Sequence, residues 1–397
     1  MNEDELRRKA LAFLEEHPYD AADPRPFRAA QFDAGLAWVH FPVHAGGLGL
    51  APVQQEIVTS IFDEHDIPVG LGDNPIGYGM AAPTIATWAG RDLRSKLLKP
   101  LFTCEHIWCQ MFSEPSNGSD VAGVSTRAVR DGDTWVVNGQ KVWTSLAHRA
   151  RYGLLLARTD PSAPKHQGLS YFVVDMTSPG VEVRPLIQLT GDAEFNEVYF
   201  DDVRIPADNL LGREGDGWRV ATTTLMNERV AIGSGTSRGP SLSEPLVQTW
   251  SYRRPLMEAA VRGAFRERVL RLVVEAEVVR TAGDRARDTA AAGTPGPEGS
   301  IVKLVSAELM QRIASLNLEL LGADAMIHEV GYAMARSDDE DTPPWNSASK
   351  RYLRSRAFTI EGGTSEIMRN ILAERILGLP GDVRVDKDVA WQDIAKS

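Results

Sequence analysis

The sequence predicts an α+β protein in which a helical region, a β-rich region and a second helical region follow one another. Three observations predict this order. Apolar residues recur with a helical period over residues 1–106, short β-rich runs between turns occupy residues 107–212, and the helical period returns over residues 213–397. Helices and strands do not alternate along the chain, so a parallel fold of the Rossmann type is disfavoured. We expect each region to form a domain.

The first region reads as a series of amphipathic helices. In the first of them, Leu6, Ala10, Leu11 and Leu14 form one apolar stripe. The glycine-rich run 45–50 interrupts the pattern, and Pro100 is expected to bend or end the last helix, because proline lacks the backbone N–H that a helix interior uses. The helices expected here span residues 5–16, 27–35, 52–64, 80–88 and 92–102.

The middle region reads as a small antiparallel β domain, barrel-like or sandwich-like. Asn138-Gly139, directly after the β-rich run 134–137, predicts a hairpin turn, because this dipeptide favours the left-handed backbone of tight turns. Other runs rich in β-branched and aromatic residues are separated by Pro, Gly and Asp. These further strands are expected at residues 152–158, 170–175, 181–185 and 196–201.

The last region again shows helical periodicity. The run 295–299, which holds two prolines and two glycines, marks a break between long helices. The charged tail beyond Pro380 is expected to be ordered only by packing on a partner subunit. The helices expected here span residues 217–232, 262–292, 300–321, 347–357 and 365–377.

Composition excludes several classes of protein. The formal net charge of −11 argues against a broad nucleic-acid-binding surface. The sequence contains no run of 18 or more apolar residues, so no membrane span is expected. The charged start lacks the apolar core of a signal peptide. Cys104 and Cys109 form neither a disulfide framework nor, with their neighbours, a metal site, which favours two reduced thiols in a cytoplasmic protein.

The segment 112–145 carries the strongest functional pattern. It opens with a polar turn of small residues, whose backbone N–H groups are able to face an anion. It ends with Trp143 beside Thr144 and Ser145, a flat aromatic wall next to short hydrogen-bonding side chains. Such an arrangement suits a planar heteroaromatic ligand. An ordinary core tryptophan is the alternative interpretation of Trp143 taken alone.

The ordered run of these parts resembles the flavin-binding segment of the acyl-CoA dehydrogenase family. The resemblance implies FAD as cofactor and the acyl-CoA dehydrogenase fold, with an N-terminal helical domain, a central antiparallel β domain and a C-terminal helical bundle. It implies that Ser119 meets the pyrophosphate and that Ser145 approaches the flavin N5. The cofactor-binding residues implied in this way are Phe112, Ser113, Gly118, Ser119, Trp143, Thr144 and Ser145.

The run 359–370 carries a second resemblance, to the segment that holds the catalytic base in many members of the family. There a Glu precedes a Gly-Thr pair, but here Gly362 precedes Gly363-Thr364 and Glu361 stands one residue away. A second branch of the family places the base immediately before an Arg on the first helix of the C-terminal domain. Glu228-Arg229 matches that pattern, and Gly362 leaves room for the Glu228 carboxylate.

These matches give each residue an expected role. Oxidation of an acyl thioester needs a base for the α proton, donors for the thioester oxygen and an acceptor for the β hydride. The resemblance implies Glu228 as base and the backbone N–H of Gly362 as donor, with Arg229 and Glu361 beside the substrate. Glu361 is the rival base, and without Gly362 the carboxylate of Glu228 would read as one of many on a helix surface.

Two regions depart from homotetrameric members, in which a neighbouring subunit helps to hold each FAD. Residues 250–256 lack an Arg-x-x-Phe-Gly motif, and Glu319 replaces a Gln ahead of Gly322-Ala323. The chain is therefore expected to pair with a homologous subunit, as in bacterial α2β2 acyl-CoA dehydrogenases, several of which act on steroid side chains. Such pairing would give two FAD for each tetramer.

The resemblance also implies an acyl-CoA substrate and an electron-transfer flavoprotein as electron acceptor. A bulky, branched or steroid side-chain acyl group fits the room beside Gly362, but the acyl group itself cannot be read from the sequence. A homo-oligomer, an acyl-CoA oxidase that uses O₂, a non-catalytic subunit and a carrier-protein thioester are the alternatives.

Overall fold

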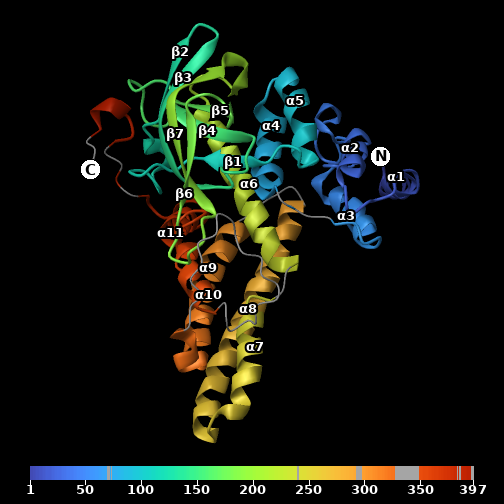
Figure 1. The fold of residues 1–397 in the computed structure, drawn as a ribbon, viewed down its shortest axis with the longest axis vertical. Helices are drawn as coiled ribbons and strands as arrows, with labels where there is room; N and C mark the ends of the chain where they lie inside the picture. Colours follow the sequence, from blue (N-terminus) through green and yellow to red (C-terminus); the bar gives the residue numbers. More distant parts are fainter. Residues whose placement is uncertain are drawn as a thin grey trace.

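The computed structural model describes residues 1–68, 72, 74–238, 241–291, 297–326, 348–381, 383 and 386–394, with the backbone alone for 229–238 and 290–291. Helices, a sheet and further helices follow one another as predicted, which confirms the fold class. Figure 1 shows the N-terminal helices on one side of the sheet and the long C-terminal helices extending away below it. Among the described residues, no helix is both long and apolar enough to cross a membrane.

The described part of the N-terminal region contains five α-helices. The first begins with a capping box, in which the Asn2 side chain accepts from the Glu5 N–H and the Glu5 carboxylate accepts from the Asn2 N–H. Pro100 lies inside the last turn of the fifth helix, which ends two residues later. The helices are α1 (Glu3–Glu16), α2 (Arg25–Asp33), α3 (Gln55–Asp63), α4 (Ala82–Trp88) and α5 (Arg91–Phe102).

The central sheet is mostly antiparallel. Its strands run in the order β6-β7-β3-β2-β4-β5-β8, and β1 pairs in parallel with β4 off this path. The strands are β1 (Trp108–Met111), β2 (Arg127–Asp131), β3 (Thr134–Ser145), β4 (Tyr152–Arg158), β5 (Leu169–Asp175), β6 (Val181–Leu186), β7 (Phe195–Pro206) and β8 (Leu210–Leu211).

The hairpin turn predicted at Asn138-Gly139 is wrong. The turn that joins β2 to β3 lies at Gly132-Asp133, and β3 continues through Asn138 and Gly139. The Asn138 side chain exchanges hydrogen bonds with Asp202 on β7, and the β3–β7 register shifts at this point. A Cβ on Gly139 would lie 2.6 Å from Thr126 Oγ1. The dipeptide therefore marks a bulge in a long strand, where a close approach requires glycine.

Strand β4 is buried on both faces. Leu154 and Leu156 pack in one core with Ile85 and Leu98 of the N-terminal helices and Val220 of the C-terminal region. The alternate residues of β4 point into a second core beneath β3 and β7. The period of two along a strand thus places one strand in two cores, which explains why its seven residues are continuously apolar apart from the last.

Six α-helices follow the sheet among the residues that the structure describes. α7 is absent from the predicted helices, because Pro245 reads as an interruption, yet Pro245 lies in the first turn, where proline fits. α8 and α9 pack against each other through Val269, Leu309 and Leu316. The helices are α6 (Gly217–Arg238), α7 (Glu244–Arg253), α8 (Ala259–Ala291), α9 (Glu298–Leu321), α10 (Ala348–Ser355) and α11 (Ser365–Ile371).

The expectation that the tail is ordered only by a partner subunit is wrong for residues 386–394. Their backbone pairs with the loop after β4, because the N–H groups of Trp391 and Gln392 donate to the carbonyls of Ala163 and Pro161 at 3.0 Å each. Figure 1 shows this end of the chain beside the sheet. This contact could not be predicted from the sequence, because its partners lie more than 200 residues apart.

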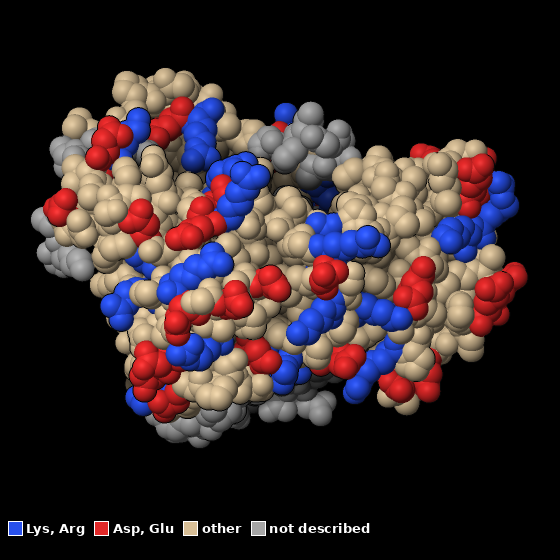
Figure 2. Space-filling model, turned by 90° about the horizontal axis from the view of Figure 1, so that it is seen from above, with Lys and Arg blue, Asp and Glu red and all other residues tan. Residues whose placement is uncertain are grey.

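Charged side chains are mixed over the surface that Figure 2 presents. Basic and acidic groups alternate across that face without a broad area of one sign. Several form exposed ion pairs of the kind that contribute little to stability, such as Lys99 with Asp33. Both cysteines are free thiols, with Cys109 fully buried and Cys104 partly exposed. Among the described residues, no cluster of His, Cys, Asp and Glu is suited to a metal ion.

Candidate active site

A buried ion pair fixes the start of the predicted cofactor segment. The Lys141 ammonium lies 2.8 Å from Glu114 Oε1 and donates to the Phe112 carbonyl at 2.9 Å. The Glu114 carboxylate also accepts from the backbone N–H groups of Ser125 and Thr126. One carboxylate and one ammonium thereby hold together the segments around residues 112, 125 and 141. This pair was not predicted from the sequence, although a lysine at an inward position of a strand was a signal.

The environment keeps this pair charged. Burial alone would raise the pKa of Glu114, but the Lys141 ammonium and the hydrogen bonds outweigh burial and lower the pKa to about 2. Burial lowers the pKa of Lys141, and the neighbouring carboxylate opposes that change. A buried carboxylate with several donors is stable in its ionised form. We therefore treat the two groups as a carboxylate and an ammonium at neutral pH.

Trp143 is presented outward by the end of β3. The β3–β7 register shifts between Lys141 and Thr144, and Trp143 has a left-handed φ of 59°. Its side chain is 56% exposed, although the edge of the Phe195 ring packs against it. A large aromatic surface left open by a strained strand end is available to a planar ligand.

The two residues after Trp143 lie at the same end of β3. Thr144 is fully buried, and its hydroxyl has no hydrogen-bond partner among the described residues. Ser145 is half-buried at the strand end. Asn196 donates to the Thr144 carbonyl at 3.0 Å and holds this strand end in place.

The other predicted cofactor residues lie on the loop after β1. Phe112 is buried, and its ring packs edge-on against Tyr171 at 5.7 Å. Ser113 is half-buried and accepts from the Val142 N–H through its carbonyl. Gly118 and Ser119 are exposed, and a Cβ on Gly118 would meet nothing within 4 Å. The loop therefore leaves open space beside a backbone that is held at both ends.

Glu228 lies on α6, which is anchored one turn earlier. Thr224 is fully buried and hydrogen-bonds to the Tyr171 hydroxyl at 3.1 Å and to Thr84 Oγ1 at 2.9 Å. This fixes α6 against β5 and the N-terminal helices. Burial raises the pKa of Tyr171, and the Glu228 carboxylate adds to this effect. Glu228 itself is half-buried. The Arg229 side chain lies outside the described residues.

Lys303 connects the Glu228 region to the glycine turn. Its ammonium donates to the carbonyl of Phe358 at 3.0 Å and to that of Gly363. Burial lowers the pKa of Lys303, while the carboxylates of Glu361 and Glu228 oppose this. The two candidate bases are thus within electrostatic reach of one ammonium. Lys303 was not predicted from the sequence as a site residue, although a lysine on the apolar face of a helix was a signal.

The glycine turn has a backbone that only glycine adopts easily. Gly362 and Gly363 have φ values of 63° and 94° in succession. A Cβ on Gly363 would lie 2.5 Å from the Met368 side chain. The Gly362 N–H has no hydrogen-bond partner among the described residues. The next residue, Thr364, caps α11 by accepting from the Ile367 N–H.

Glu361 is engaged by Arg354 of α10. Two nitrogen–oxygen distances of 3.0 Å join the guanidinium to the carboxylate. Arg354 Nε also lies 3.0 Å from the Glu194 carboxylate on the loop before β7. The carboxylate closest in sequence to the usual base position therefore belongs to an ion-pair network that links two regions of the fold.

The two regions that depart from homotetrameric members are also engaged within the chain. Arg253 donates to the carbonyls of Leu320 and Leu321 at 3.1 Å each and pairs with Asp324 at 2.7 Å, which caps the end of α9. Glu319 pairs with Arg268 at 2.7 Å. Both side chains thus have partners in their own subunit.

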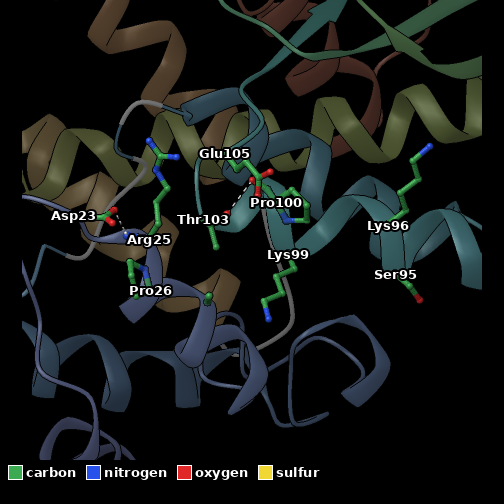
Figure 3. Close-up of a pocket in the computed structure, with 10 residues that line it drawn as sticks. Asp23, Arg25, Pro26, Ser95, Lys96, Lys99, Pro100, Thr103 and Glu105 are labelled. Carbon is green, nitrogen blue, oxygen red and sulfur yellow. Dashed lines mark hydrogen bonds between the residues drawn. The ribbon is translucent and has the colours of Figure 1, made fainter.

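A surface pocket of about 470 Å³ lies elsewhere, between α2 and α5. Figure 3 shows that polar and charged residues line it, among them Arg25, Lys96 and Glu105. It contains none of the predicted site residues. The chemistry predicted from the sequence therefore has no connection to this pocket.

Comparison with known proteins identifies the family. A model of the acyl-CoA dehydrogenase middle domain matches residues 109–203, and a model of the acyl-CoA dehydrogenase C-terminal domain matches residues 215–377. The chain belongs to the acyl-CoA dehydrogenase family. This confirms the resemblance found in the sequence and the class of enzyme, because the family consists of oxidoreductases. Its members are FAD-dependent flavoproteins.

Curated relatives of this acyl-CoA dehydrogenase homologue come from Mycobacterium tuberculosis. Acyl-CoA dehydrogenase FadE34 is 37% identical over 359 residues, which cover 89% of this chain and 46% of FadE34. Acyl-CoA dehydrogenase IpdE1 is 37% identical over 357 residues, which cover 88% of this chain and 86% of IpdE1. The chain thus spans about half the length of one relative and most of the other.

Solved structures share the fold. The ChsE4-ChsE5 complex from Mycobacterium tuberculosis contains a chain that is 26% identical, with a TM-score of 0.67 over 96% of this chain and 98% of that one. An acyl-CoA dehydrogenase from Geobacillus kaustophilus is 26% identical, with a TM-score of 0.69 over 94% and 97%. A steroid acyl-CoA dehydrogenase, Tcur3481-Tcur3483, matches in fold with a TM-score of 0.70 and 24% identity, over 96% and 98%.

Proposed function

We propose that this chain is a catalytic subunit that converts an acyl-CoA thioester to a trans-2-enoyl-CoA, with Glu228 as the base. One observation carries the proposal. Arg354 holds both carboxylate oxygens of Glu361 in an ion pair, and Glu228 and Glu361 both lie in the electrostatic field of Lys303, the residue that binds the glycine turn. The carboxylate on α6 is thus the better candidate for contact with substrate.

The residues divide the reaction between them. Glu228 takes the α proton of the acyl group and becomes a neutral carboxylic acid. The Gly362 N–H, which no described residue accepts, donates to the thioester oxygen, where negative charge develops. Lys303 holds the carbonyl of the adjacent Gly363 and keeps this donor in position. A base for the α proton and a fixed donor for the thioester oxygen together favour proton removal.

The open surface around Trp143 fits the isoalloxazine ring of FAD. Trp143 would cover the ring, Ser145 would approach it, and Gly118 and Ser119 would contact the pyrophosphate. Three observations support this assignment: Trp143 is exposed, the Thr144 hydroxyl has no hydrogen-bond partner among the described residues, and a Cβ on Gly118 would meet nothing within 4 Å. FAD, when bound, would supply the acceptor for the β hydride.

We propose a heterotetramer with a homologous subunit, containing two FAD. The engagement of Arg253 and Glu319 inside their own subunit supports this, because neither is presented to a neighbour's cofactor. A steroid acyl-CoA dehydrogenase among the structural relatives favours a bulky or steroid side-chain acyl group. An electron-transfer flavoprotein would then accept the electrons.

The test uses the visible spectrum and native mass of the chain, purified alone and after co-expression with a homologous partner. The proposal predicts a colourless or weakly yellow single chain and a yellow complex with half an FAD per polypeptide. Anaerobic addition of acyl-CoA should bleach the complex. A yellow homo-oligomer with one FAD per chain would end the heteromer proposal.

Three further outcomes would change the assignment. Stoichiometric peroxide in air would indicate an oxidase in place of a dehydrogenase. A chain that binds no FAD under either condition would indicate a structural subunit. Bleaching by a carrier-protein thioester and not by its CoA analogue would change the substrate class.

A further inference from the structure

The C-terminal segment 386–394 lies against the loop that follows β4. Pro164 and Ala390 form an isolated antiparallel bridge, and Trp391 and Gln392 donate backbone hydrogen bonds to the same loop. Lys165 lies 2.7 Å from Asp386 and 3.1 Å from Asp120. One lysine thereby joins the tail to the residue directly after Ser119.

Arg158 is the group over which the tail closes. It is 2% exposed at the end of β4, and the hydrogen bonds that its guanidinium donates to described residues go to backbone carbonyls. It donates to Ala122 at 2.6 Å, to Lys165 at 2.8 Å and to Val124 at 3.2 Å. Burial lowers the pKa of Arg158 to about 10, against the opposing effect of nearby carboxylates, so the group stays protonated at neutral pH. The guanidinium thus holds two carbonyls of the turn 121–124, those of Ala122 and Val124.

Trp391 covers that cation. The Arg158 guanidinium lies 4.6 Å from the centre of the indole ring, and the indole N–H donates to the Gly123 carbonyl at 3.2 Å. A guanidinium over an indole face is attracted to it, more strongly when water is excluded. Trp391 therefore shields Arg158 and also binds the turn directly.

We infer that Trp391 is a positioning residue for FAD: it fixes the turn 121–124 and, through it, the loop of Gly118 and Ser119. This rests on the proposed function. Gly118 has no side chain and Ser119 is exposed, so side-chain contacts do little to hold these two residues. A loop ordered before the ligand arrives does not lose that conformational freedom on binding, so affinity rises. The tail is thus part of the cofactor site, although no contact between the tail and the ligand is required.

The experiment measures the dissociation constant of FAD for the apoprotein of the assembly that carries FAD, by quenching of flavin fluorescence. Trp391→Ala should raise this constant about tenfold, the cost of reordering one or two backbone residues. Trp391→Phe keeps a ring over Arg158 but loses the donor to Gly123, so its effect should be smaller. Val389→Ala, in the same segment and 37% exposed, is the matched control and should bind FAD like wild type.

A merely structural role would give a different result. In that case Trp391→Ala would lower the melting temperature of the apoprotein but leave the FAD dissociation constant unchanged, which would overturn the inference. If the alanine variant fails to fold, an unchanged dissociation constant in Trp391→Phe has the same meaning. A wild-type assembly that binds no FAD would overturn the proposed function itself, and this inference with it.

Discussion

Arg354 and Glu361 form a two-point ion pair that joins α10 to the glycine turn. The guanidinium also packs near the rings of Phe195 and Phe358, at 5.7 and 4.9 Å. A carboxylate held on both oxygens cannot reach an α proton without breaking that pair. The ion pair therefore favours Glu228 over Glu361 as the base, a choice that the sequence alone leaves open.

Glu228→Gln should reduce the rate of anaerobic flavin reduction by acyl-CoA by roughly 10²–10⁴-fold, because a positioned base is lost while the shape is kept. Glu361→Gln is the matched control, and its effect should stay below about tenfold, because its carboxylate serves an ion pair. The two rates are compared in stopped-flow experiments at saturating substrate. A larger loss for Glu361→Gln would reverse the assignment of the base.

Lys303→Met should lower kcat by roughly 10–100-fold with a smaller change in KM, because the carbonyls of Phe358 and Gly363 lose a charged donor. The Gly362 N–H matters most when charge develops on the thioester oxygen. Lys350→Met removes a less buried ammonium, paired with Asp192, and is the control. Equal losses of kcat in the two variants would argue that only general destabilisation is involved.

The buried Glu114–Lys141 pair predicts a pH dependence of stability. The pKa of Glu114 is lowered to about 2 in the folded state, below its ordinary value of 4.5. The stabilisation is therefore complete above pH 4.5 and is lost as the pH falls toward 2, and it amounts to about 3 kcal/mol. Melting temperatures of the apoprotein between pH 6 and 3 test this.

The double variant Glu114→Gln/Lys141→Met removes both charges and provides the comparison. Its melting temperature should fall less steeply below pH 4.5 than that of wild type. Lys141→Met alone should be the least stable form, because it leaves a buried carboxylate without its cation, at a cost of about 3–5 kcal/mol. Parallel pH profiles for wild type and the double variant would contradict the predicted role of Glu114.

Two tryptophans on β3 should behave oppositely. Trp143 is 56% exposed and Trp135 is 1% exposed. Trp143→Ala should weaken FAD binding at least about tenfold and leave the apoprotein melting temperature nearly unchanged, because an aromatic wall is lost and no core is disturbed. Trp135→Ala should destabilise the protein by about 3–5 kcal/mol. A large drop in melting temperature for Trp143→Ala would place that side chain in the core.

The order of helices and strands could be predicted because it depends on periodicity, which is a local property. α9 begins two residues before its predicted start and ends at the predicted residue, Leu321. The turn predicted at Asn138-Gly139 is wrong because the hydrogen bond from Asn138 to Asp202 on β7 overrides the local turn preference. Lys303 and Trp391 were missed because their partners lie 60 and more than 200 residues away along the chain. Local patterns contain no information about such contacts.

Strand β4 has a consequence for how the protein could be divided. Leu154 and Leu156 share a core with Ile85 of the N-terminal helices and with Val220 of α6. A fragment that lacked either helical region would expose this face of the strand to water and offer it for aggregation. Expression of the sheet alone should therefore yield insoluble material, and limited proteolysis should not release it as a stable piece. We therefore expect the three parts of the fold to unfold together, because β4 packs in one core with both helical regions.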